Sequence, residues 1–148
     1  MNDLATRYIG PSGLDPIMNR IFNTLPKLGI SVAGSRLLAV RGRKSGEWRT
    51  TMVNLLTVEG TRYLVAPRGH TQWVKNLRVT PVGELRLGRK AELFTARELP
   101  DADKLPILRA YLDRWGWEVG RFFEGLDKNS TDAELVAIAP GFPVFELS

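Results

Sequence analysis

Cationic side chains, glycines and a hydroxyl crowd the segment from Arg41 to Arg49, which reads RGRKSGEWR. Its two glycines free the backbone to turn tightly, so a loop between two strands can point its N–H groups at one anion. Arg43, Lys44 and Arg49 would add charge-assisted hydrogen bonds. The spacing is not that of a P-loop, and no helix follows. The segment therefore predicts an anion site, with a solvated turn carrying surface charge as the alternative.

A second segment, residues 66–77, reads APRGHTQWVKNL and combines a strand end, a loop and a helix start. Thr71 is expected to cap this short helix. The unpaired N–H groups of a helix start favour an anion or a carbonyl-rich ring. Asn76 is expected to orient the loop by bonding to its backbone, whereas Trp73 and Leu77 are expected in the core.

His70 is the only histidine of the chain. It can be a general acid or an ordinary loop residue, and the loop residue is favoured because no carboxylate lies beside it in sequence. A third feature is an aromatic set, for which a helix packed on the sheet is favoured over an apolar wall above a cofactor ring. The aromatic residues are Tyr111, Trp115, Trp117, Phe122 and Phe123.

Composition limits the chemistry that these segments can carry. The chain has 148 residues, which predicts a single domain over residues 1–148. Because there is no cysteine and one histidine, disulfides, thiolate or His-rich metal sites and cysteine nucleophiles are excluded. The net charge of +5 suits an anionic partner. No stretch approaches the roughly 20 apolar residues of a membrane span, and no signal peptide is recognised, so a cytoplasmic protein is expected.

The elements that would position these residues begin with an irregular arm over residues 1–13. A helix is expected from Asp15 and Pro16, with an apolar stripe from Leu14 to Leu25 that ends before Pro26. Packing of this helix on a sheet is favoured over weak association with a membrane surface, because its polar face is not strongly basic.

Strands and further helices follow from residue 37 onward. Strands are expected at residues 37–40, 50–58, 61–66, 82–87, 91–99 and 142–147, with hairpin turns at Glu59-Gly60 and around residues 88–90. Helices are expected from a cap at Thr71 to a stop before Pro81, from a cap at Asp101 to about Trp115, over residues 117–126 and over residues 132–138. Five or six strands joined mostly by hairpins predict an α+β barrel.

The motifs along the chain are, in order, Gly-Arg-Lys-Ser-Gly, an arginine three residues later, a hairpin, Val-Ala-x-x-Gly and Trp-x-x-Asn-Leu. Their order resembles that of the deazaflavin-dependent nitroreductase family. The resemblance covers roughly residues 15–100. Members of that family are actinobacterial oxidoreductases with a split β-barrel of five to six mostly antiparallel strands. They transfer a hydride from the reduced deazaflavin coenzyme F420 to quinones, nitroaromatics or enones. The resemblance also implies a homodimer.

The resemblance implies a binding role for each matching residue. Arg43, Lys44 and Arg49 would hold the phosphate and acidic tail of the coenzyme. The other implied cofactor-binding residues are Ser45 and Gly46 in the loop, Met52 and Val53 along the ring, Ala66, Pro67, Arg68, Gly69 and His70 at its other edge, and Trp73, Asn76 and Leu77 as support. No catalytic residue is assigned, and the candidates for proton donor are His70, Tyr111 and solvent.

Three alternatives stay open at this point. FMN could replace F420 in the same barrel, because split barrels bind FMN through a similar basic loop. Haem ranks low, since axial ligation would rest on His70 alone. A nucleic-acid-binding barrel would use the basic composition, but the cations are interleaved with acids and no single-strand stacking motif is found, so no nucleic acid is expected as a partner.

Overall fold

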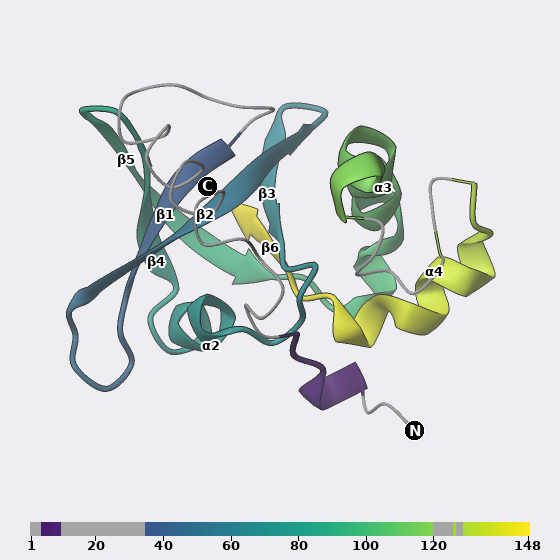
Figure 1. Cartoon of the computed structure of the whole chain (residues 1–148), viewed down its shortest axis with the longest axis horizontal. Helices are drawn as coiled ribbons and strands as arrows, with labels where there is room; N and C mark the ends of the chain where they lie inside the picture. The colour runs from purple at the N-terminus through teal and green to yellow at the C-terminus, as the bar shows by residue number, and fades with distance from the viewer. Residues whose placement is uncertain (1–3, 10–34, 120–125, 127–128) are drawn as a thin grey trace.

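The computed structural model describes residues 4–9, 35–119, 126 and 129–148, and its centre is an antiparallel barrel (Figure 1). The barrel closes in the order β1-β2-β3-β6-β5-β4, with every neighbouring pair antiparallel. This confirms the predicted α+β barrel of five to six strands. The strands are β1 (Ser35–Arg41), β2 (Trp48–Val58), β3 (Thr61–Val65), β4 (Val82–Leu87), β5 (Lys90–Glu98) and β6 (Val144–Leu147).

The two longest strands, β2 and β5, each take part in two sheets. Strand β2 pairs with β1 up to Asn54, but it pairs with β3 only from Leu55 to Val58. Strand β5 changes partner in the same way, from β4 to β6, at Ala96. Within the described residues, the first half of β2 therefore has a neighbouring strand on one side only. This is the split of the barrel, and it leaves backbone N–H and C=O groups on an open edge.

The hairpin turns form where the sequence predicts them. Glu59 and Gly60 join β2 to β3 with φ angles of 50° and 82°, and Gly88, with φ 62°, lies in the turn between β4 and β5. Two consecutive residues with positive φ match the right-handed twist of the flanking strands.

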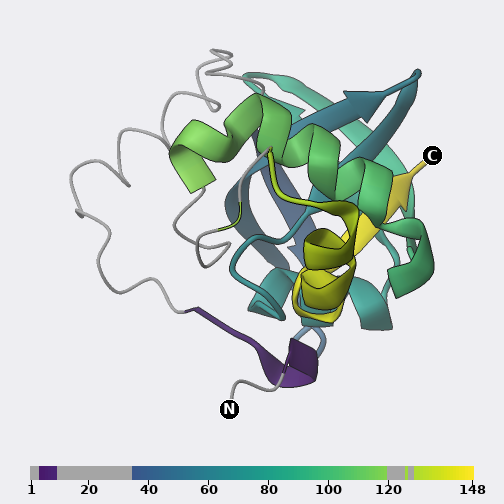
Figure 2. The ribbon, with the colours of Figure 1, turned by 90° about the vertical axis from the view of Figure 1, so that its right-hand side faces the viewer.

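Two apolar clusters hold the barrel and its helical cover together. One fills the barrel interior, where Leu38, Leu64 and Phe145 are almost fully buried. The other lies between the barrel and helices α3 (Leu105–Val119) and α4 (Asp132–Ile138), around Leu112 and Trp115. Figure 2 shows α3 lying across one face of the barrel. Each fully buried side chain of this size contributes about 1.5–3 kcal/mol to folding.

Three helices occur in the described residues, namely α2 (Gln72–Val79), α3 (Leu105–Val119) and α4 (Asp132–Ile138). The predicted start of α3 at Asp101 is wrong. Residues Asp101–Asp103 form a separate 3-10 turn, η2, and the first bond of α3 runs from Leu108 N to Lys104 O at 2.8 Å. The reason is Pro106, which has no N–H to donate inside a helix that began at Asp101.

The C-terminal part also differs from the prediction in its boundaries. Helix α3 continues through Val119, so no new helix begins at Trp117, and most of the predicted 117–126 helix lies outside the described residues. Helix α4 is confirmed, with a capping box between Thr131 and Glu134. The last strand begins at Val144 and not at the predicted residue 142, because a 3-10 turn, η4 (Ala139–Gly141), precedes it.

The N-terminal residues 4–9 are not the irregular arm that the sequence predicts. They form a 3-10 turn, η1 (Leu4–Thr6), and then a β-bridge between Tyr8 and Gly69. The helix predicted from Asp15 lies outside the described residues. No helix in the described ranges is long and apolar enough to cross a membrane.

Candidate functional site

A cavity of about 650 Å³ opens where β2 leaves β3. Its walls come from the open half of β2, from the loop before it, and from the segment that joins β3 to α2. Four of its lining side chains are cationic and none is acidic, which makes it suited to an anion. The lining residues are Tyr8, Val40, 42–45, 49–54, 65–68, 71–73, Asn76 and Tyr111.

The basic loop, residues 42–47, joins β1 to β2 at one end of this cavity. Its backbone closes on itself, because Gly42 N donates to Glu47 O and Gly46 N donates to Gly42 O, both at 2.8 Å. Gly46 has a φ of 74°, which an L-residue rarely adopts. The glycines therefore set the turn, as the sequence predicts, and Gly46 itself does not line the cavity.

Arg43 ties the basic loop to helix α2. Its backbone N–H and its guanidinium both donate to Oδ1 of the buried Asn76, at 3.0 and 2.8 Å, and the guanidinium also donates to Oε1 of Gln72 at 2.8 Å. Asn76 thus orients a loop through its backbone, but it is the basic loop and not the neighbouring residues 67–70. Both acceptors are neutral amides, so they leave the charge of Arg43 uncompensated.

Two other cations of the loop region are largely available to a ligand. Lys44 is exposed and forms no hydrogen bond or ion pair within the described part of the chain. Arg49 is 62% exposed and lies 3.9 Å from the Glu47 carboxylate. An exposed pair at that distance contributes little, so Arg49 can exchange Glu47 for a more strongly charged anion.

Cation–π contacts to Trp48 lie at the base of the basic loop. Two guanidinium groups lie near the Trp48 ring, that of Arg41 at 3.8 Å and that of Arg86 at 5.4 Å from the ring centroid. Arg41 also donates to Gly46 O at 3.3 Å. These contacts restrict the start of β2, and with it the positions of Lys44 and Arg49.

Thr71 stands at the N-cap of α2, but its side chain makes no capping bond, so that prediction is wrong. Thr71 is 7% exposed, lines the cavity, and its buried Oγ1 has no hydrogen-bond partner among the described residues. A buried hydroxyl without a partner costs about 1–3 kcal/mol.

The segment before α2 supplies the opposite edge of the cavity. Ala66, Pro67 and Arg68 line it, together with Trp73, whose ring packs 5.9 Å from that of Phe145. Gly69 has a φ of 92°, and a Cβ there would collide with the backbone of Arg7.

Besides Gly46, three residues of the sequence-predicted set do not line the cavity. Gly69 pairs with Tyr8 in the bridge, and Leu77 is fully buried in the barrel core. The His70 ring turns away, with Nε2 contacting Leu4 O at 3.0 Å and Pro140 O at 3.2 Å. A histidine held in this way has neither the position of a general acid nor that of a haem ligand in this cavity.

Of the aromatic set, only Tyr111 lines the cavity within the described side chains. Trp115 is buried in the core between α3 and the barrel, as the favoured interpretation predicts. Trp117, Phe122 and Phe123 lie outside the described side chains.

Sequence reasoning missed several lining residues. Thr50, Thr51 and Asn54 lie on the open half of β2, and the run of polar residues on both faces of one strand is a signal that could have found them. Gly42, Val40 and Val65 neighbour predicted positions. For Tyr8 we find no local signal, because only tertiary contacts bring it to the cavity.

A split antiparallel barrel with a cationic cavity at the split defines a class of protein, the cofactor-binding split barrels. The profile of the F420H(2)-dependent quinone reductase family matches residues 18–116, which is more than half of the chain. The chain therefore belongs to that family. It is an oxidoreductase, and its cofactor is coenzyme F420.

Solved structures agree with the fold. An F420-H2 dependent reductase superposes with a TM-score of 0.55 at 19% identity, covering 78% of this chain and 94% of that one. A structure described as a domain-swapped dimer gives a TM-score of 0.57 at 19% identity, covering 89% and 94%. A protein of unknown function from Agrobacterium tumefaciens gives 0.55 at 17% identity, covering 95% and 57%. No curated protein matches the chain.

Proposed function

We propose that this protein transfers a hydride from reduced F420 to a small organic acceptor of the quinone type. The observation that carries the proposal is the cavity at the split, which has four cationic lining residues and no acidic one. A phosphate with an acidic tail requires such a lining, whereas an uncharged substrate alone would not.

The anionic part of F420 would bind at the basic loop. Lys44 and Arg49 have the free charge for it, and Arg43 keeps N–H donors beyond those given to Gln72 and Asn76. Ser45 would shape the loop, since its Oγ accepts from Glu47 N at 3.2 Å. The cationic side chains and N–H donors of this loop therefore match the phosphate and the acidic tail of the cofactor.

The ring would lie along the open half of β2. Met52 and Val53 offer apolar contact there, and the unpaired edge of the strand offers backbone donors and acceptors. Ala66, Pro67 and Arg68 would line the other edge, and the unpartnered hydroxyl of Thr71 would gain an acceptor or donor from the ring. Trp73 and Asn76 would support this wall.

The chemistry that the bound cofactor supplies is hydride donation, and a quinone that accepts a hydride takes up one proton to become a hydroquinone. The chain's own residues would orient the two reactants and limit water around them. Because the His70 ring turns away from the cavity, the proton would come from the Tyr111 hydroxyl or from solvent.

Two other ligands are disfavoured by particular observations. FMN also carries a phosphate, but it lacks the acidic tail for which Lys44 and Arg49 leave charge available. Against nucleic acid, arginines outside the cavity are neutralised by acidic partners, as in the pairs Arg78–Glu98 and Arg62–Glu92.

The protein would act as a homodimer, which is supported by the domain-swapped dimer among the structurally similar proteins. Sedimentation equilibrium would measure the mass in solution. A monomeric mass at micromolar concentration would refute the proposed dimer. It would not affect the proposal of reductase activity.

The proposal is tested by titrating the purified protein into oxidised F420 and following the cofactor's fluorescence. We expect saturable quenching with micromolar affinity or better, and no displacement by equimolar FMN. Menadione, a nitroaromatic and an enone are then offered with reduced F420, and menadione is expected to be the best acceptor. Absence of quenching at high protein concentration would overturn the proposal.

A further inference from the structure

The N-terminal segment, residues 4–9, is anchored to the loop at the edge of the cavity. Its backbone pairs with that loop through two bonds, from Ile9 N to Arg68 O at 2.8 Å and from His70 N to Arg7 O at 2.7 Å. The Arg68 guanidinium also donates to Ile9 O at 2.7 Å. The segment thus forms an antiparallel β-bridge with residues 68–70.

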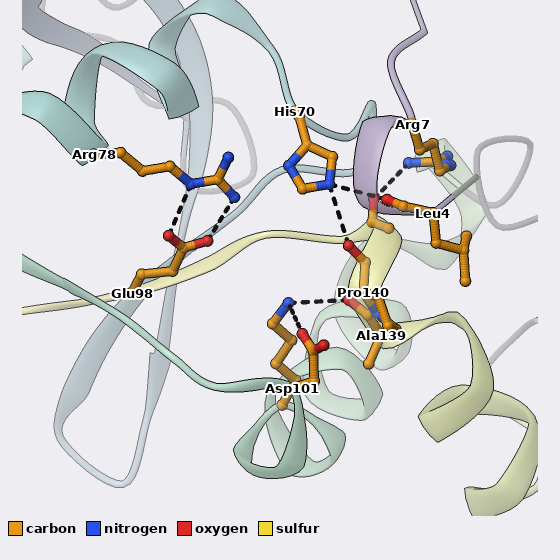
Figure 3. A network of polar contacts seen from close by, with 10 residues as sticks. Leu4, Arg7, His70, Arg78, Glu98, Asp101, Ala139 and Pro140 are labelled. Atoms are coloured by element: carbon orange, nitrogen blue, oxygen red, sulfur yellow. Dashed lines mark hydrogen bonds and ion pairs between the residues drawn. The ribbon is translucent and has the colours of Figure 1, made fainter.

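Buried side chains hold the same segment from the other side. The Arg7 guanidinium donates to Pro67 O at 2.8 Å and to Gly141 O at 3.1 Å, and it lies 4.0 Å from the centroid of the Phe142 ring. Figure 3 shows His70 reaching Leu4 and Pro140 in the same network. The segment is therefore fixed both to the loop and to the turn before β6.

This anchoring brings Tyr8 to the cavity. Tyr8 lies in the bridge with Gly69, between the two anchored residues Arg7 and Ile9, and its side chain is 46% exposed while lining the cavity. A half-exposed aromatic side chain of this kind lies at the mouth. In contrast, Tyr111 lines the cavity from α3 and is 2% exposed.

The N-terminal segment that carries Tyr8 lies away from the basic loop. Figure 1 shows the hairpin that carries the basic loop and the N-terminal segment on opposite sides of α2. A cofactor whose acidic tail is bound at the basic loop leaves the end near Tyr8 to the second reactant. At this end the Tyr8 ring can stack on a flat, uncharged ring, and the Arg68 guanidinium beside it donates to Ile9 O.

We infer that Tyr8 forms the acceptor side of the site, where a quinone ring stacks against it, and that docking of residues 4–9 is what completes this side. The inference rests on the proposed function. It makes Tyr8 a specificity residue for the acceptor and gives it no part in holding the cofactor.

The test uses the full chain saturated with oxidised F420, which cannot reduce the acceptor, and measures menadione binding by equilibrium dialysis. Tyr8→Ala should raise the menadione Kd by about two- to twelvefold, the range of an aromatic pair. Tyr8→Phe, which keeps the ring, should stay within about twofold of wild type. In turnover, the KM for menadione should rise in Tyr8→Ala, while the F420 Kd stays unchanged.

Arg7→Met, which keeps the Tyr8 side chain but removes the anchor that positions it, should raise the menadione Kd as Tyr8→Ala does. Val136→Ala, an exposed apolar residue on α4 away from the cavity, is the matched control and should change nothing. An unchanged menadione Kd in Tyr8→Ala, with F420 bound normally, would overturn the inference. Loss of F420 binding in the wild-type protein would instead refute the proposed function.

Discussion

Asn76 and Arg43 share two hydrogen bonds, both accepted by one side-chain oxygen: the Arg43 backbone N–H lies at 3.0 Å and its guanidinium at 2.8 Å from Asn76 Oδ1. Asn76 is buried at 4% exposure, so helix α2 is the fixed element and the basic loop is the one positioned. The anion site is thus built from the loop of the β1–β2 hairpin and from helix α2, which follows the β2–β3 hairpin.

Replacing Asn76 by alanine should release the basic loop. It leaves the Arg43 N–H without its acceptor, so we expect a loss of about 1–3 kcal/mol in stability, together with weaker F420 binding. Asn76→Asp keeps the acceptor oxygens but adds a negative charge beside Arg43, so it should preserve stability better while still weakening binding. Thermal unfolding and fluorescence titration measure the two effects separately, and equal F420 affinity in all three proteins would contradict the role of Asn76.

Lys44→Ala and Arg49→Ala should each weaken F420 binding by about 1.5–3 kcal/mol, because each removes a charge-assisted contact to the anionic part. Lys90→Ala is the control, since Lys90 is an exposed cation that does not line the cavity. The measurement is the F420 Kd at two salt concentrations. An equal loss of F420 affinity in Lys90→Ala would indicate that the overall charge of the protein, and not a direct contact, controls binding.

Thr71→Val should have opposite effects on stability and on binding. Removing the unpartnered buried hydroxyl should raise stability by about 1 kcal/mol, or roughly 2–4 °C in Tm for a chain of this size. F420 affinity should fall by about 1 kcal/mol, because the hydroxyl is the group offered to the ring. Thr71→Ser keeps the hydroxyl and serves as the control. If Thr71→Val is more stable and binds F420 as tightly as wild type, the Thr71 hydroxyl does not contact the cofactor.

Lys104 is a buried lysine, 3% exposed, whose Nζ donates to Ala139 O at 3.0 Å and pairs with Asp101 at 2.7 Å. Lys104→Met should destabilise the protein by about 1–3 kcal/mol, since the buried carbonyl then has no donor. Asp101→Asn keeps an acceptor oxygen but leaves the charge of the buried Lys104 unpaired, so it should also destabilise the protein. Chemical denaturation compares the two, and F420 affinity should be unchanged in both.

The strands and their turns could be predicted from the sequence because they rest on local rules. Alternation along β4 and β5 and the Glu59-Gly60 turn fix where those hairpins form. The start of α3 could not be placed from Asp101, although Pro106 alone was sufficient reason against a helix beginning there.

By itself, the sequence determined that a cation-rich turn lies within residues 41–49, since glycine spacing and charge act over a few neighbours. Only the tertiary structure decided which groups meet it. Long-range contacts bring Asn76 to Arg43, turn His70 toward Leu4 and Pro140, and carry Tyr8 to the cavity. Their partners lie far away in sequence, and pairing at such separations follows from closure of the barrel and not from any local pattern.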